Sequence, residues 1–204
     1  MVESTINGIF QTPIYFSKLN RKLTKKELSF IKKTALNAYK NEGNTTSNNT
    51  YILNQKVFKN LKTELDLIIQ DYFNKVICSA DNITPFITQS WLNYTETNQY
   101  HHKHAHPNSL VSGVFYINCD EQFDKIKFHS ETYKAIKPAI KKWNLWNSES
   151  WWFSIKTGDI IMFPSSLTHS VEIKKGNNTR ISLAFNVFIK GTFGSNKDLI
   201  ELKI

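Results

Sequence analysis

Apolar residues recur at helical spacing in two stretches of the first third of the chain. Thr24 and Glu27 have the spacing of a capping box, in which a hydroxyl begins a helix and a carboxylate three residues later turns back to it. The apolar positions that follow are Leu28, Ile31, Ala35 and Ala38. Residues 41–49 are polar and predict a loop. A second helical stripe then contains Phe58, Leu61, Leu65, Ile68, Tyr72 and Val76. We expect both stripes to pack against a sheet.

From about Pro85 onward the pattern changes to short runs of β-branched and aromatic residues separated by turn-like pieces. The runs are FITQSWLNY, LVSGVFYI, KIKF, SWWFSI, DIIMF, HSVEI and RISLAFNVF. Helices followed by many strands predict an α+β fold with a sandwich or barrel core. We divide the chain into a mainly helical flank (1–84), a β core (85–190) and a C-terminal tail (191–204), all within a single domain.

Composition narrows the function only slightly. Lys and Arg together number 26 against 17 Asp and Glu, which gives a net charge of +9. This charge suits an anionic partner, but the lysines are scattered, so it does not by itself predict nucleic-acid binding. The two cysteines are far apart and imply no disulfide framework, and no apolar run is long enough to span a bilayer. We expect a cytoplasmic protein, located in the host cytoplasm if the chain is viral.

Histidine is concentrated in one short segment: HHKHAHPNS contains four of the six histidines. His104 and His106 are two residues apart, so on a strand they point to the same side. Pro107 cannot donate to a ladder, which predicts that the pair lies at a strand end. A metal ion needs a further ligand from elsewhere, and His169 follows the apolar strand DIIMF and its turn. His129 is the other candidate, but we expect it to be a hydrogen-bonded polar side chain.

The last strand carries a candidate anion-binding residue. Arg180 is one of only two arginines in the chain. Strand alternation puts it on one face with Ser182, Ala184 and Asn186, whereas Ile181, Leu183, Phe185 and Val187 form the other face. An arginine beside a hydroxyl suits bidentate capture of a carboxylate. The alternative is a surface salt bridge or a snorkelling side chain, and the residues alone leave both open.

The order HxH, distal His, then Arg resembles the 2-oxoglutarate/Fe(II)-dependent oxygenases. The segments ITQSWLNY…HKHAHPNSLVSGVFYI and GDIIMFPSSLTHSV…RISLAFN look like the members of this family found in marine bacteriophages, and IFQTPIY is similar to the opening of that group. The resemblance implies a double-stranded β-helix, or jelly roll, with N-terminal helices packed on one sheet and the metal inside one mouth.

The resemblance also implies a set of site residues. Carried over residue by residue, Fe(II) falls on His104, His106 and His169. Arg180 falls on the residue that pairs with the far carboxylate of 2-oxoglutarate. Further cosubstrate contacts are implied for Ser182, Tyr94 and Tyr116. His101 and His102 have no counterpart role, and we expect them to line the entrance.

The chain departs from the family pattern at one ligand. His106 stands where the superfamily has a carboxylate. Three neutral imidazoles keep a face of the metal open but leave its charge uncompensated, a charge that the 2-oxoglutarate dianion would neutralise. They also make iron harder to oxidise, and a three-histidine site suits zinc as well.

Two functions are therefore open on the sequence. The first is an oxygenase that uses O2 and couples oxidative decarboxylation of 2-oxoglutarate to hydroxylation of an unknown substrate. The second is a non-catalytic, metal-binding β-helix or cupin-like module. For the oxygenase we favour a protein side chain or a small molecule as substrate over nucleic acid, because Lys103 is the only lysine between His101 and Asp120. A homodimer is also compatible with this hypothesis.

Four of the five tryptophans lie just before the turn that begins at Thr157. They form either a lid or substrate platform, or part of a strand edge. For Trp151 and Trp152 we favour a strand edge that packs on the helices. For Trp143 and Trp146 both alternatives stay open.

Overall fold

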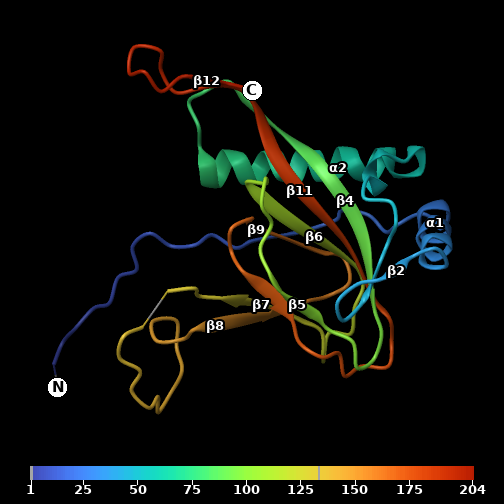
Figure 1. Ribbon diagram of the computed structural model, residues 1–204, viewed down its shortest axis with the longest axis horizontal. Helices are drawn as coiled ribbons and strands as arrows, with labels where there is room; N and C mark the ends of the chain where they lie inside the picture. The colour runs from blue at the N-terminus through green and yellow to red at the C-terminus, as the bar shows by residue number, and fades with distance from the viewer. Residues whose placement is uncertain (1, 133) are drawn as a thin grey trace.

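The computed structural model describes residues 2–132 and 134–204 of the chain (Figure 1). Two β-sheets and two main helices make up the fold. The helices are α1 (Lys25–Ala35) and α2 (Lys59–Tyr72), and α2 is preceded by two short 3-10 turns, Ile52–Asn54 and Lys56–Phe58, and followed by a π-helical turn, Phe73–Ile77. Among the helices of the described residues, none combines the length and the apolar character needed to cross a membrane.

The larger sheet has eight antiparallel strands. In spatial order, seven of them are β1 (Tyr15–Lys18), β9 (Asp159–Pro164), β6 (Val111–Asn118), β11 (Arg180–Phe193), β4 (Ile83–Thr95), β3 (Thr45–Thr46) and β2 (Tyr39–Lys40). The eighth, β12 (Leu202–Lys203), pairs with the far end of β11. The long strands β4 and β11 pair at the centre of this sheet. Three other strands of the sheet, β1, β2 and β3, come from the N-terminal segment that precedes β4.

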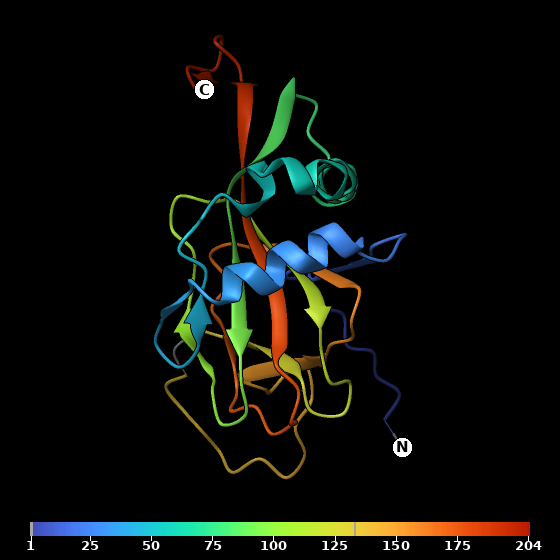
Figure 2. The same ribbon diagram turned by 90° about the vertical axis from the view of Figure 1, so that its right-hand side faces the viewer.

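The smaller sheet has four short strands in the order β5 (His101–His104), β10 (His169–Val171), β7 (Lys125–His129) and β8 (Ser150–Ser154). All of its pairings are antiparallel. Because the chain passes repeatedly from one sheet to the other, the two sheets form the jelly roll of a double-stranded β-helix. Both views show the helices lying across the strands of the larger sheet, with the smaller sheet apart from them (Figures 1 and 2).

The buried interior consists of two separate apolar clusters. The larger one lies between the helices and the larger sheet and includes Leu61, Leu65, Leu183 and Phe185. The smaller one lies between the two sheets and consists of Tyr116, Ile126, Phe128, Ile155, Ile161 and Phe163. The predicted seven strands and two helices are confirmed, and the helices pack on one face of one sheet as expected.

The first helix begins as predicted but buries an unexpected residue. Thr24 caps it, and the reciprocal bonds of the capping box with Glu27 are both present. The expectation for Leu28 was wrong, because its side chain is 40% exposed whereas that of Glu27 is 2% exposed. Arg21 explains the difference: its guanidinium donates two hydrogen bonds to Glu27 and a third to Glu64 of α2, which turns the carboxylate inward.

Replacing Glu27 by Gln should lower the free energy of unfolding by about 1–3 kcal/mol at pH 7, because the partner arginine loses its buried counter-ion. Burial opposes ionisation of Glu27, but the hydrogen bonds from Arg21 and Thr24 outweigh it and keep the pKa of the carboxyl below its ordinary value of 4.5. A lowered folded-state pKa stabilises the fold above pH 4.5, and this contribution is lost as the pH falls through the folded-state value. Urea denaturation at pH 7 and pH 3 should show the difference between wild type and variant shrinking at the lower pH. An equal difference at both would contradict the assignment.

The tryptophans of β8 do not pack on the helices, so that expectation is corrected. Trp151 and Trp152 are 39% and 52% exposed, and β8 is an edge strand of the smaller sheet. Lys125 Nζ lies 3.8 Å above the ring of Trp152. The helices cover the other sheet, so no helix is available to these two rings. Trp143 and Trp146, on the loop before β8, are exposed as well.

Candidate metal and cosubstrate site

Three histidines from two separate segments meet at one end of the smaller sheet. His104 ends β5 and lies directly opposite His169, the first residue of β10. His106 follows β5, and its backbone N–H donates to the Ser165 carbonyl, which ties this segment to the end of β9. Pro107 comes next, where the ladder has already stopped, as its lack of an N–H predicts.

The three rings lie close enough to share one ion. The ring centroids of His104 and His169 are 4.3 Å apart. The centroid of His106 lies 4.9 Å from that of His104 and 5.2 Å from that of His169. One ligand nitrogen from each ring lies within 4.8 Å of the others. We call His104, His106 and His169 the inner triad.

Hydrogen bonds fix the tautomer of two members of the inner triad. His104 Nδ1 lies 2.8 Å from the carbonyl oxygen of His102, and His169 Nδ1 lies 3.1 Å from that of Leu167. A carbonyl oxygen can only accept, so each Nδ1 carries the proton and donates it. Each Nε2 therefore keeps its lone pair for a metal, an arrangement typical of metal-binding histidines.

Electrostatics favour the neutral form of all three rings. Burial lowers the pKa of His169 to about 3 and that of His106 to about 4, with nearby imidazoles adding to the effect. Burial also lowers the pKa of His104, against the opposing hydrogen bond to the His102 carbonyl. A metal ion competes only with protons for these nitrogens, so unprotonated rings at neutral pH are ready ligands.

Arg180 is buried in the same cavity with unused donors. It begins β11, and its side chain is 3% exposed. One Nη donates to Thr95 Oγ1 at 3.1 Å, whereas Nε and the other Nη have no hydrogen-bond partner within the described residues. A buried guanidinium with two unpaired nitrogens, each carrying N–H, is costly unless an acceptor binds there. The alternative of a surface salt bridge or a snorkelling side chain is therefore excluded.

A buried ion pair lies behind Arg180. Lys174 Nζ is 3.2 Å from both carboxylate oxygens of Asp124, with side chains 0% and 1% exposed. Asp124 also lies 3.9 Å from the guanidinium of Arg180. One buried carboxylate thus faces two buried cations, and the surplus positive charge suits an anionic ligand beside Arg180.

Three further residues were expected at the site. Two of them line this cavity, and the third does not. Ser182 and Tyr116 both line it. Tyr94 lies on the opposite face of β4, where its hydroxyl donates to the Ile31 carbonyl of α1 at 2.7 Å within the larger apolar cluster. The structure therefore corrects the expectation that Tyr94 contacts a cosubstrate.

His101 reaches deeper than the entrance position expected for it. It lines the cavity that contains Arg180, and it also lines a second groove, further out, that includes Tyr39 and Tyr51. His102 lines only this outer groove. The reason is a β-bulge, because three steps along β5, from His101 to His104, oppose two steps along β10, from Val171 to His169. The bulge turns His101 to the same side as His104. A bulge has no signal in a single sequence.

Taken together, a jelly roll holds three neutral imidazoles and a buried, partly unpaired arginine in one cavity. These groups fit a divalent metal with nitrogen ligands and an acid bound beside it. Residues 89–186 match the family model described as "Putative 2OG-Fe(II) oxygenase". The match indicates a 2-oxoglutarate/Fe(II)-dependent oxygenase, an enzyme class that needs both iron and 2-oxoglutarate, and it favours the oxygenase over the non-catalytic module.

Solved structures share the fold at low sequence identity. An oxidoreductase of the 2OG-Fe(II) oxygenase family from Burkholderia pseudomallei is 14% identical, with a TM-score of 0.54 and coverage of 84% of this chain and 83% of that one. HygX from Streptomyces hygroscopicus, with nickel, 2-oxoglutarate and hygromycin B bound, is 11% identical, with a TM-score of 0.57 and coverage of 86% and 82%. A Pseudomonas putida prolyl-4-hydroxylase is 10% identical, with a TM-score of 0.56 and coverage of 86% and 92%. None of the curated proteins compared matches the chain.

Proposed function

We propose that the inner triad holds the Fe(II) of this oxygenase and that Arg180 anchors the far carboxylate of 2-oxoglutarate. The observation that carries the proposal is the shared cavity: ring nitrogens free to bind a metal and a buried guanidinium with two unpaired nitrogens line the same space. When bound, iron and 2-oxoglutarate supply the activation of O2, the decarboxylation to succinate and the hydroxylation of a substrate C–H bond.

The residues around the anchor have distinct tasks in this proposal. Thr95 and Asp124 orient the guanidinium, one by a hydrogen bond and the other by its charge. Ser182 lies two residues along the same strand face and supplies a hydroxyl donor next to the same carboxylate. Burial raises the pKa of Tyr116, so this phenol stays protonated and able to donate a hydrogen bond.

His106 in place of a carboxylate leaves the charge of the metal to be compensated by the cosubstrate. Three neutral imidazoles do not offset the dipositive charge, so the 2-oxoglutarate dianion is the first anion to do so. We therefore propose that Fe(II) and 2-oxoglutarate bind with strong mutual dependence. Iron alone is held by the three imidazole nitrogens, and the cosubstrate brings the charge balance.

The groove outside the inner triad supports an uncharged substrate. Its volume is about 640 Å³, within the usual range for small-molecule sites, and it includes Tyr39, Tyr51 and Trp91. The other groups that line it are amides, hydroxyls, Pro107 and the histidines, with no Lys, Arg, Asp or Glu among the described residues. A chain with net charge +9 leaves this groove uncharged, which disfavours a phosphate backbone. We propose a neutral, hydrogen-bonding protein side chain or small molecule. A homodimer, a cytoplasmic location and the specific likeness to bacteriophage members stay predictions.

The proposal is tested by adding Fe(II) and then 2-oxoglutarate to the protein without oxygen and recording the weak visible charge-transfer band of the chelate. Replacing His169 by Ala should remove the band and the release of succinate in air, because only two imidazoles are left. His129 is the matched control: it lies on the neighbouring strand β7, and its Nε2 is within 2.8 Å of Ser170 Oγ. The variant His129→Ala should keep the band. A His169→Ala protein with a wild-type band would refute the ligand assignment.

A further inference from the structure

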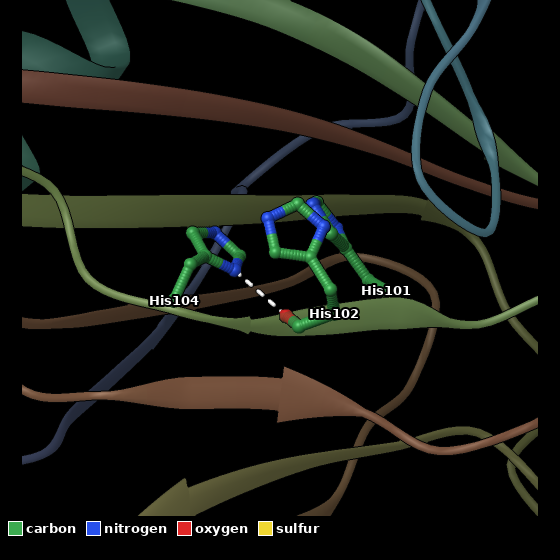
Figure 3. A group of neighbouring side chains, drawn as sticks. All are labelled: His101, His102 and His104. Atoms are coloured by element: carbon green, nitrogen blue, oxygen red, sulfur yellow. Dashed lines mark hydrogen bonds between the residues drawn. The ribbon is translucent and has the colours of Figure 1, made fainter.

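A second group of imidazoles lies beside the inner triad and shares one of its members. His101, His102 and His104 place one ligand nitrogen each within 4.8 Å of the others. Their ring centroids are 4.6, 4.8 and 5.2 Å apart. We call these three residues the outer triad, and Figure 3 shows their rings gathered on one side of β5.

The backbone explains how three residues within four positions can converge. On a regular strand His101 would point away from His102 and His104. The bulge between the pairs His169–His104 and Val171–His101 removes this alternation and turns the first ring back toward the third. The stacked rings of His101 and His104, inclined by 24°, are the direct result.

The two outermost rings have ring nitrogens to spare. Nδ1 of His102 is buried and has no hydrogen-bond partner within the described residues. Nδ1 of His101 has a single contact, with the Asn44 amide at 3.5 Å, which is too long to be strong. The Glu42 carboxylate lies 3.9 Å from His102, so a negative charge is already present beside the rings.

We propose that the outer triad is a second binding position for a divalent transition-metal ion with a preference for imidazole, such as Zn²⁺, and that it competes with the inner triad for His104. The outer site itself does not rest on the oxygenase function, whereas its competition with the inner triad rests on the ligand set proposed above. Imidazole nitrogens at this separation need only a small adjustment to surround one such ion.

Competition follows from the single free nitrogen of His104. Its Nδ1 donates to the His102 carbonyl, so Nε2 alone can bind a metal. An ion in the outer triad therefore leaves the inner triad with two imidazoles, and an ion in the inner triad leaves the outer one with two. The chain should hold one tightly bound ion at a time, with two alternative positions at the mouth of the cavity.

The test measures Zn²⁺ binding by calorimetry to metal-free protein, without cosubstrate and without turnover. The variant His106→Ala disables the inner triad and should still bind one Zn²⁺. Adding His102→Ala to it should weaken binding about 100-fold or more, since the outer triad then loses a direct ligand. Adding His129→Ala instead, an imidazole outside both triads, should change the affinity less than about twofold.

Each result decides the proposal. Equal Zn²⁺ affinity in His106→Ala with and without His102→Ala would overturn the outer site. Two tightly bound Zn²⁺ per wild-type chain would overturn the competition. If circular dichroism shows that His106→Ala is unfolded, His169→Ala disables the inner triad from β10 and the same comparison is made there. Loss of the Fe(II)–2-oxoglutarate band in His169→Ala reports on the inner triad separately, so the two proposals fail independently.

Discussion

Replacing Arg180 by Ala should raise the KM for 2-oxoglutarate about 100-fold or more, with succinate release as the readout. The guanidinium is buried and two of its nitrogens have no hydrogen-bond partner within the described residues, so a cosubstrate carboxylate gains charge-assisted hydrogen bonds there. The Arg180→Lys variant should show a smaller loss, because an ammonium keeps the charge but not the two-pronged geometry.

The other arginine provides the matched control. Arg21 binds Glu27 and Glu64 at the helical end of the molecule. The Arg21→Lys variant should lower stability without changing the KM for 2-oxoglutarate. Unchanged KM in Arg180→Ala, with the fold intact, would remove the proposed anchor. An Arg180→Lys variant with a wild-type KM would instead show that charge alone is enough.

Replacing Asp124 by Asn should lower the free energy of unfolding by about 3–5 kcal/mol, measured by urea denaturation at pH 7. The carboxylate is 1% exposed and faces the fully buried ammonium of Lys174 and the guanidinium of Arg180. Its removal leaves two buried cations without a counter-ion. The oxygens of Asp124 also accept the Asp120 N–H, so the loss extends to the turn before β7.

Two further variants separate this explanation from a general effect of losing a charge. Glu172→Gln breaks the exposed pair with Lys127 and should cost no more than about 1 kcal/mol. Asp124→Asn combined with Lys174→Met should be more stable than Asp124→Asn alone, because the stranded ammonium is gone. A double variant as unstable as the sum of the single changes would show that the pair does not act as a unit.

Seven of the strands and both helices could be predicted from the sequence because each depends on a local pattern, whereas β1, β2, β3 and β12 were not predicted. Alternation on β11 put Arg180 and Ser182 on the cavity face, and the structure has them there. The capping box at Thr24 began α1 at the expected residue. That His104 and His169 face each other depends on strand pairing, and this part was predicted through the family resemblance.

The misplaced residues depend on features that are not local. Tyr94 pairs with Ile181 of β11, so both point toward the helices, but the register between two strands so far apart in the chain is not visible in either one. His101 turns inward through a bulge, which needs the partner strand to be known. Glu27 is held inward by Arg21, whose guanidinium also binds Glu64 of α2, 43 residues further along the chain. In each case the position of the residue is decided by contacts between distant segments.

The division of the interior into two apolar clusters has a consequence for how this enzyme can diverge. Most of the buried apolar side chains lie between the helices and the larger sheet, on the far side from the histidines. Mutations that reshape the uncharged groove or the loop before β8 leave the larger apolar cluster, and the stability it provides, intact. The residues of the groove can therefore change to accept new substrates while the larger apolar cluster, between the helices and the larger sheet, keeps the protein folded.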